Sequence, residues 1–180
     1  SLIAEINPGG FRSVLDIGGA SGTWTMAWLK QEPAATAILF DLPDVIPLAR
    51  ERLGREALAE RVQLAAGDYN QDALPGSADL VWLSAIVHQN SRAKNRALFA
   101  RIANAMDRSG VLLIRDIVME QSRTEPAYGA LFAVNMLVGT EGGNAYSLQE
   151  MSEDLASAGF TDVELIRCDP GMNSIVAARL

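Results

Sequence analysis

Short apolar runs alternate with longer stretches of helical periodicity along most of this chain. The apolar runs predict strands near residues 13–17, 36–41, 61–66, 78–84, 110–118, 161–168 and 174–179. Apolar positions at helical spacing predict helices near residues 22–31, 44–53, 91–107, 126–138 and 148–158. Because strands that alternate with helices form mostly parallel sheets covered on both faces, we expect a seven-stranded α/β sheet.

Two local signals shape the end of the chain. Residues 147–150 read SLQE, a capping box in which Ser147 accepts a backbone N–H and Glu150 reaches back to the helix start. Gly159 is placed to end that helix. The turn at residues 169–171 joins the last two predicted strands as an antiparallel hairpin. We therefore expect one antiparallel strand at the end of an otherwise parallel sheet.

The first predicted strand runs directly into a glycine-rich turn. Residues 14–22 read VLDIGGASG, which places Gly18, Gly19 and Gly22 between the strand and the next helix. The second strand ends at Asp41, 19 residues after Gly22. In α/β folds, glycines in this position let the backbone approach a nucleoside, and the carboxylate accepts hydrogen bonds from its ribose hydroxyls. The pattern predicts a nucleoside site.

The spacing of the turn indicates which nucleoside it suits. A dinucleotide fingerprint starting at Gly18 requires glycine at position 20 and glycine or alanine at position 23, where the chain has Ala20 and Thr23. Asp16 adds a negative charge beside the turn, which favours a cationic ligand over a pyrophosphate. S-adenosylmethionine is a nucleoside with a cationic reactive centre. We therefore expect a methyltransferase, with a nicotinamide-dependent reductase as the less favoured alternative.

Further polar side chains follow the later strands, at the edge where open α/β sheets bind ligands. Asp68 and Tyr69 follow the third strand, where a carboxylate can accept from the adenine amine and an aromatic ring can lie against the base. Asp68 before Asn70 is equally typical of a turn cap. Ser84 closes the fourth strand. Such groups at successive strand ends indicate a site more strongly than any one of them alone.

His88 is the only histidine of the chain, and it emerges where the fourth strand ends. A lone histidine is often structural, but imidazole is the side chain best suited to take up a proton near neutral pH. Methyl transfer to oxygen needs a deprotonated hydroxyl in line with the sulfonium methyl, so one base and the orientation of two molecules suffice. Asp116, late in the fifth strand, is placed to orient the imidazole or stabilise its cation.

Composition and charge exclude several kinds of partner and site. The 180 residues carry 15 basic and 22 acidic side chains, a net charge of -7, and no cluster of Lys and Arg that could follow a phosphate backbone. We therefore expect no nucleic-acid partner. No apolar run reaches transmembrane length and no signal peptide is evident, so we expect no membrane partner and a cytoplasmic location. The single Cys168 excludes an internal disulfide and a site of several thiolates, and we expect it to be buried in a late strand; no metal is expected.

Six segments occur in one order across essentially the whole chain: LDIGGASG, FDLPDV, GDYNQDALP, SAIVHQ, SGVLLIRDIVM and EGGNAYSLQEMSEDLASAGF. This ordered set resembles the catalytic domain of the plant-type small-molecule O-methyltransferases and their bacterial relatives, which include acetylserotonin and polyketide-tailoring enzymes. The resemblance implies the class I methyltransferase fold, which is Rossmann-like. It also implies methyl transfer from S-adenosylmethionine to a hydroxyl of a small aromatic or polyketide-like molecule.

The resemblance implies a role for each matched position. His88 would be the general base, with Asp116 as an acidic neighbour, and the helix near 126–138 would line the acceptor pocket. The expected acceptor contacts are Phe132, Asn135 and Met136; Asn135 is an amide among apolar neighbours, so we expect it to need a partner or a ligand. The glycine turn and the resemblance together give the expected cofactor contacts: Asp16, Gly18, Gly19, Asp41, Leu42, Asp68, Tyr69 and Ser84.

Three positions depart from the family pattern. Gln89 stands where the family usually has aspartate after the histidine, and Ala145 stands where it has a second acidic residue. Ser84 replaces the basic residue that often meets the methionine carboxylate. These departures leave open a cofactor-binding relative with a hydroxylase-like or regulatory role, and methylation of nitrogen in place of oxygen.

The family also has an N-terminal helical domain that forms a homodimer and helps to close the acceptor pocket. No segment of these 180 residues corresponds to it. We therefore expect residues 1–180 to be the cofactor-binding catalytic domain. The chain is either a fragment of a longer, homodimeric protein or a complete protein with an unusually open acceptor site.

Overall fold

The computed structural model describes residues 2–180, which form two compact units. Unit 1 extends up to Trp82 and includes Ala105–Val111, and unit 2 comprises Leu83–Asn104 and Leu112–Leu180. Two strands, β4 (Ala78–Ser84) and β5 (Met106–Asp116), contribute residues to both units.

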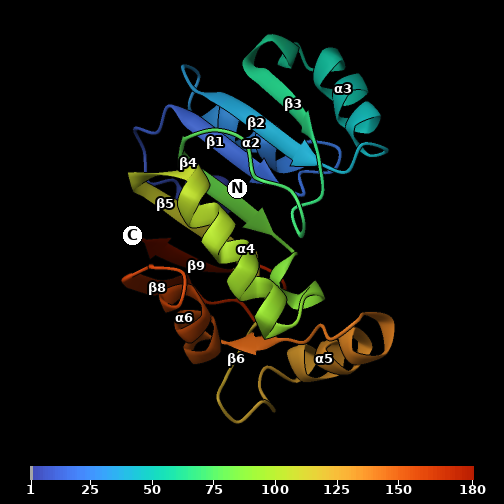
Figure 1. Ribbon diagram of the computed structural model, residues 1–180, viewed down its shortest axis with the longest axis vertical. Helices are drawn as coiled ribbons and strands as arrows, with labels where there is room; N and C mark the ends of the chain where they lie inside the picture. The colour runs from blue at the N-terminus through green and yellow to red at the C-terminus, as the bar shows by residue number, and fades with distance from the viewer. Residues whose placement is uncertain (1) are drawn as a thin grey trace. The chain divides into compact units, whose positions relative to one another are not determined.

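Seven strands pair in the order β3-β2-β1-β4-β5-β9-β8 (Figure 1). The others are β1 (Ser13–Ile17), β2 (Thr36–Asp41), β3 (Val62–Ala66), β8 (Asp162–Arg167) and β9 (Ser174–Arg179). The pairs β1–β2 and β2–β3 are parallel, whereas β9 is antiparallel to both β5 and β8. The predicted seven-stranded sheet and terminal hairpin are confirmed. The antiparallel strand lies second from the edge and not at the end of the sheet as expected, because the last strand of the chain inserts between β5 and β8.

Unit 1 surrounds its strands with α1 (Leu2–Ile6), α2 (Thr23–Gln31), α3 (Ile46–Arg55) and the short 3-10 helix η1 (Ala59–Arg61). In Figure 1, α3 lies alongside β3. The apolar face of α3 is buried with Met26 and Leu39 in one cluster, which removes its side chains from water. Arg61 donates to the carbonyls of Leu29, Glu32 and Ala35, so its guanidinium caps the end of α2.

Unit 2 contains the 3-10 helix η2 (Val87–Gln89), all but the last residue of α4 (Arg92–Ala105), and the helices α5 (Ala127–Gly139) and α6 (Leu148–Ala156). Two further short strands, β6 (Val118–Met119) and β7 (Tyr146–Ser147), pair in parallel as a separate small sheet. The helix α6 begins at the predicted capping box, in which Ser147 accepts from the Glu150 backbone N–H and Glu150 accepts from the Ser147 N–H.

The helix α5 exposes most of its apolar side chains. Gly129 is the buried residue of this helix, and a Cβ there would come within 2.4 Å of Met119 Sδ. Its larger apolar residues Leu131, Leu137 and Val138 are at least 70% exposed. One face of α5 packs against β6 and η2, with Ala130, Phe132 and Ala133 partly buried there, whereas Leu131, Leu137 and Val138 are left uncovered by residues 2–180.

Three smaller expectations also change. The helix predicted to reach 107 ends at Ala105, and the strand predicted over 110–118 is divided between β5 and β6. Cys168 is exposed and not buried, because it follows β8, an edge strand with one open side. Within residues 2–180, the helices are all too short or too polar to cross a bilayer.

Candidate functional site

The glycine turn of unit 1 has the backbone conformation that its residues require. Gly18 has φ 69° and Gly22, which precedes α2, has φ 82°, both in the left-handed region that glycine adopts without strain. Gly19 is needed for space, because a Cβ there would lie 2.6 Å from Leu39 Cγ. The turn is fastened to the neighbouring strand by the Gly18 N–H, which donates to the Phe40 carbonyl at 2.8 Å.

Asp41 links the end of β2 to this turn. Its Oδ2 accepts from the backbone N–H of Ala20 at 2.7 Å, and its Oδ1 accepts from the N–H of Leu42 at 2.7 Å. Each carboxylate oxygen has a second lone pair, which is the acceptor that a ribose hydroxyl requires. The structure therefore brings together Gly18, Gly19, Asp41 and the half-exposed Leu42 in unit 1.

Asp16 is buried beneath the turn and does not face solvent. Its Oδ2 accepts from the Thr25 hydroxyl at 2.5 Å, which ties β1 to the first turn of α2. Burial raises the pKa of Asp16 from 3.8 to about 6, the hydrogen bonds from Thr25 oppose this rise, and the charge of Asp41 adds to it. Asp16 is thus placed to shape the turn.

Asp68 and Tyr69 follow β3, as expected, in the same unit. The Asp68 carboxylate accepts from the Asn70 N–H and from the Gln71 side-chain amide, each at 2.8 Å, so it does cap a local turn. The pKa of Tyr69 is raised, first by burial and then by the charges of Asp68 and Asp41. The Gly67 N–H donates to the Asp41 carbonyl at 2.9 Å, which joins this loop to the end of β2.

In unit 2, His88 and Asp116 form a buried pair. The imidazole Nδ1 lies 2.8 Å from Asp116 Oδ1, and the backbone N–H of His88 donates to Oδ2 at 3.2 Å. The Ile117 N–H donates to Oδ1 at 2.8 Å. Because an ionised carboxylate only accepts, a neutral imidazole in this geometry donates from Nδ1 and keeps its lone pair on Nε2. This is the arrangement of an oriented general base.

Of the expected acceptor contacts on α5, Phe132 meets the histidine. The rings of Phe132 and His88 are edge to face, with centroids 4.9 Å apart, and Tyr128 stacks on Phe132 at 6.2 Å. Met136 is partly buried. Asn135 is exposed, so water can satisfy its amide and the argument that it needs a partner does not hold.

The three positions that depart from the family pattern lie in different surroundings. Ser84 Oγ accepts from Arg115 Nη1 at 3.0 Å, and Arg115 Nε donates to Asn173 at 2.9 Å, so a basic group does stand at Ser84. Burial lowers the pKa of Arg115. Gln89 donates to the Ala85 carbonyl at 2.7 Å, and Ala145 is buried. Sequence reasoning missed Arg115, although a cation inside the apolar run LLIRDIV was a signal for it.

Residues 2–180 contain no cluster of three or more His, Cys, Asp or Glu side chains that could hold a metal ion.

Comparisons with known proteins agree on one family. Residues 1–161 match the model of the O-methyltransferase domain. The 3-hydroxy-5-methyl-1-naphthoate 3-O-methyltransferase of Streptomyces sahachiroi is 34% identical over 177 residues, which are 98% of this chain and 51% of that protein. The human N-acetylserotonin methyltransferase, solved in complex with SAM, is 25% identical with a TM-score of 0.87, covering 99% of this chain and 50% of that one.

An O-methyltransferase family 2 protein of Planctomyces limnophilus, solved in complex with apigenin, is 30% identical with a TM-score of 0.84 and covers 97% of this chain and 52% of that chain. The chain spans about half the length of the curated relatives it matches. The match over 161 residues and the ordered motifs show that this chain belongs to the O-methyltransferase domain family.

Proposed function

We propose that this chain is the catalytic part of an S-adenosylmethionine-dependent O-methyltransferase that acts on a hydroxyl of a small aromatic or polyketide-like molecule. The observation that carries this proposal is the His88–Asp116 pair, which leaves Nε2 of a buried imidazole as a base. The named substrates of its relatives, a naphthoate and acetylserotonin, support the acceptor class.

The residues of unit 1 suit the nucleoside part of S-adenosylmethionine. The glycine turn at Gly18 and Gly19 allows close approach of the backbone, and Asp41 presents carboxylate oxygens for the ribose hydroxyls. Leu42, Asp68 and Tyr69 are the further contacts, with Tyr69 against the adenine. Asp16 contributes to cofactor binding indirectly, because its hydrogen bond with Thr25 holds the glycine turn in place. In unit 2, Ser84 and the guanidinium bonded to it offer a partner for the methionine carboxylate.

His88 and Asp116 carry out the proton transfer. The acceptor hydroxyl gives its proton to Nε2 of His88, and the buried Asp116 carboxylate stabilises the imidazolium that forms. The sulfonium of S-adenosylmethionine supplies an electrophilic methyl group, so the acceptor oxygen gains the methyl and S-adenosylhomocysteine leaves. His88 then returns its proton to solvent. Phe132 orders the imidazole by ring contact, and Met136 and Asn135 are candidates to contact the acceptor from α5.

Transfer of an isotopically labelled methyl group tests this proposal. The protein is incubated with S-adenosylmethionine labelled in its methyl group and a panel of phenols, and product mass is measured. We expect a product that gains the labelled methyl, and loss of about 100-fold or more in rate for His88→Gln. A product that gains a hydroxyl instead would support the hydroxylase-like alternative that Gln89 and Ala145 leave open.

We further propose that the longer protein is a homodimer and acts in the cytoplasm. The exposed apolar face of α5 supports association, because such patches mark interaction surfaces. With one cysteine, these 180 residues depend on no internal disulfide, which is compatible with a reducing compartment. Light scattering of the longer protein and cell fractionation test these two points.

A further inference from the structure

The segment that carries His88 is held by three separate contacts to its backbone carbonyls. Asn95 on α4 donates its side-chain amide to the Val87 carbonyl at 3.0 Å. The Asn144 N–H donates to the His88 carbonyl at 2.9 Å. The Tyr146 hydroxyl donates to the Asn90 carbonyl at 2.6 Å. Two of these three donors come from the segment just before α6, far from His88 in the sequence.

Tyr146 lies in surroundings that keep its hydroxyl a donor to the Asn90 carbonyl. The residue is 5% exposed, and burial raises the pKa of its hydroxyl to about 12, with the charges of Asp154 and Glu150 adding to the rise. The hydroxyl therefore stays protonated at any working pH and acts as a donor. Since a peptide carbonyl can only accept, the bond to Asn90 has one possible direction.

The loop before Tyr146 packs closely against the backbone of His88. A Cβ at Gly143 would lie 2.4 Å from the His88 carbonyl oxygen and 3.0 Å from that of Gln89. Glycine at this position thus allows the neighbouring Asn144 N–H to reach the His88 carbonyl.

The pairing of β6 with β7 connects Tyr146 to the strand segment that follows Asp116, the residue that holds the imidazole of His88. Tyr146 in β7 pairs with Val118 in β6, and Val118 lies two residues after Asp116. Asp116 thus fixes the imidazole ring of His88, and Tyr146 in the adjacent strand holds the backbone two residues after it.

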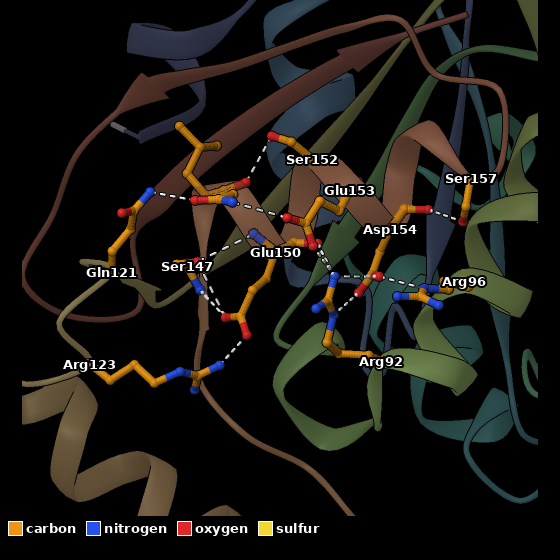
Figure 2. Close-up of polar contacts among 12 residues, drawn as sticks. Arg92, Arg96, Gln121, Arg123, Ser147, Glu150, Ser152, Glu153, Asp154 and Ser157 are labelled. Carbon is orange, nitrogen blue, oxygen red and sulfur yellow. Dashed lines mark hydrogen bonds and ion pairs between the residues drawn. The ribbon is translucent and has the colours of Figure 1, made fainter.

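Ion pairs anchor this arrangement to α4 (Figure 2). The buried Asp154 of α6 accepts from Nε and Nη2 of Arg92, each at 2.9 Å, and from Nε of Arg96 at 2.6 Å. Tyr146 lies two residues before the start of α6, and Asn95 lies in α4. The ion pairs between α6 and α4 therefore connect the elements that carry these two donors.

We propose that Tyr146 is a positioning residue for His88, acting through the Asn90 carbonyl. This inference rests on the proposed function, in which His88 is the base. It explains how the imidazole keeps its orientation although Gln89 and Ala145 provide no second carboxylate: the order comes from hydrogen bonds to the peptide backbone.

Tyr146→Phe removes the hydroxyl and retains the ring, and Ser157→Ala is its matched control. Ser157 Oγ also donates to a backbone carbonyl at 2.6 Å, that of Asp154, at the far end of α6 (Figure 2). Both proteins are labelled with ¹⁵N-histidine, and a His88→Gln sample identifies the imidazole signals of His88. We expect these signals to shift or broaden in Tyr146→Phe and to be unchanged in Ser157→Ala.

We also expect kcat to fall about fivefold in Tyr146→Phe at an unchanged KM for S-adenosylmethionine, in proportion to one neutral hydrogen bond. Imidazole signals in Tyr146→Phe that coincide with the wild-type signals would overturn the inference, whatever the rate. Turnover that survives His88→Gln would overturn the proposed function instead, because the imidazole spectrum does not depend on catalysis.

Discussion

The Nδ1 atom of His88 lies 2.8 Å from Oδ1 of Asp116, and both side chains are buried in unit 2. The carboxylate also accepts from two backbone N–H groups, so its orientation is fixed independently of the ring. Burial strengthens a hydrogen bond to a charged acceptor, so the pair can hold the imidazole of the proposed base in one orientation.

Asp116→Asn is expected to lower kcat by about 100-fold while KM for S-adenosylmethionine changes less than about twofold. The amide has nearly the same shape, but it carries no charge to stabilise the imidazolium and can turn a donor toward Nδ1. Steady-state kinetics with a phenolic acceptor measure both constants. An equal rise in KM at constant kcat would assign Asp116 to binding and contradict its role beside the base.

Gly19→Ala is expected to destabilise the protein by about 1–3 kcal/mol, because the new methyl group would be forced against Leu39. Gly54→Ala is the matched control: it lies in α3, is exposed, and its Cβ would meet nothing within 4 Å. Alanine there is expected to stabilise the protein by about 0.5–1 kcal/mol. Urea denaturation of both variants measures the change in unfolding free energy. A destabilised Gly54→Ala together with an unaffected Gly19→Ala would contradict both expectations.

The raised pKa of Asp16 predicts a specific dependence of stability on pH. Between the unfolded value of 3.8 and the folded value of about 6, the folded protein holds a proton that the unfolded chain has lost. The unfolding free energy therefore falls as pH rises through this window, by about 3 kcal/mol in total. The difference in unfolding free energy between wild type and Asp16→Asn should shrink by this amount from about pH 4 to about pH 7. A difference that is independent of pH would show that Asp16 is not buried as a shifted carboxyl.

Strands with an uninterrupted apolar run were predictable in position and type. The bounds of β1, β2, β4 and β9 are those expected, because Val14, Leu80 and Val176, among others, are fully buried and leave a clear local pattern. The capping box at Ser147 was predictable for the same reason, since both of its partners lie within one turn. Apolar composition did not predict the exposure of α5, because a helix face can be apolar and uncovered.

Contacts between distant residues were not predictable from local pattern. The strands β6 and β7 are two residues long and exist only because Val118 and Met119 pair with Tyr146 and Ser147. The bond from the Tyr146 hydroxyl to the Asn90 carbonyl joins positions 56 residues apart and leaves no periodic signal. The pairing of His88 with Asp116 could be anticipated, since His88 follows the end of β4 and Asp116 ends β5, but its 2.8 Å geometry required the structure.

The most direct test of the account is calorimetric titration with S-adenosylmethionine and S-adenosylhomocysteine, which needs no knowledge of the acceptor. Asp41→Asn removes the charge that the ribose hydroxyls would meet, and Asp44→Asn makes the same change at an exposed position three residues along. We expect saturable binding by the wild type and Asp44→Asn, and affinity about 10- to 100-fold weaker in Asp41→Asn, as for hydrogen bonds to a charged group. No binding of either ligand by the folded wild-type protein, or equal binding by all three proteins, would contradict the assignment of this turn to the nucleoside.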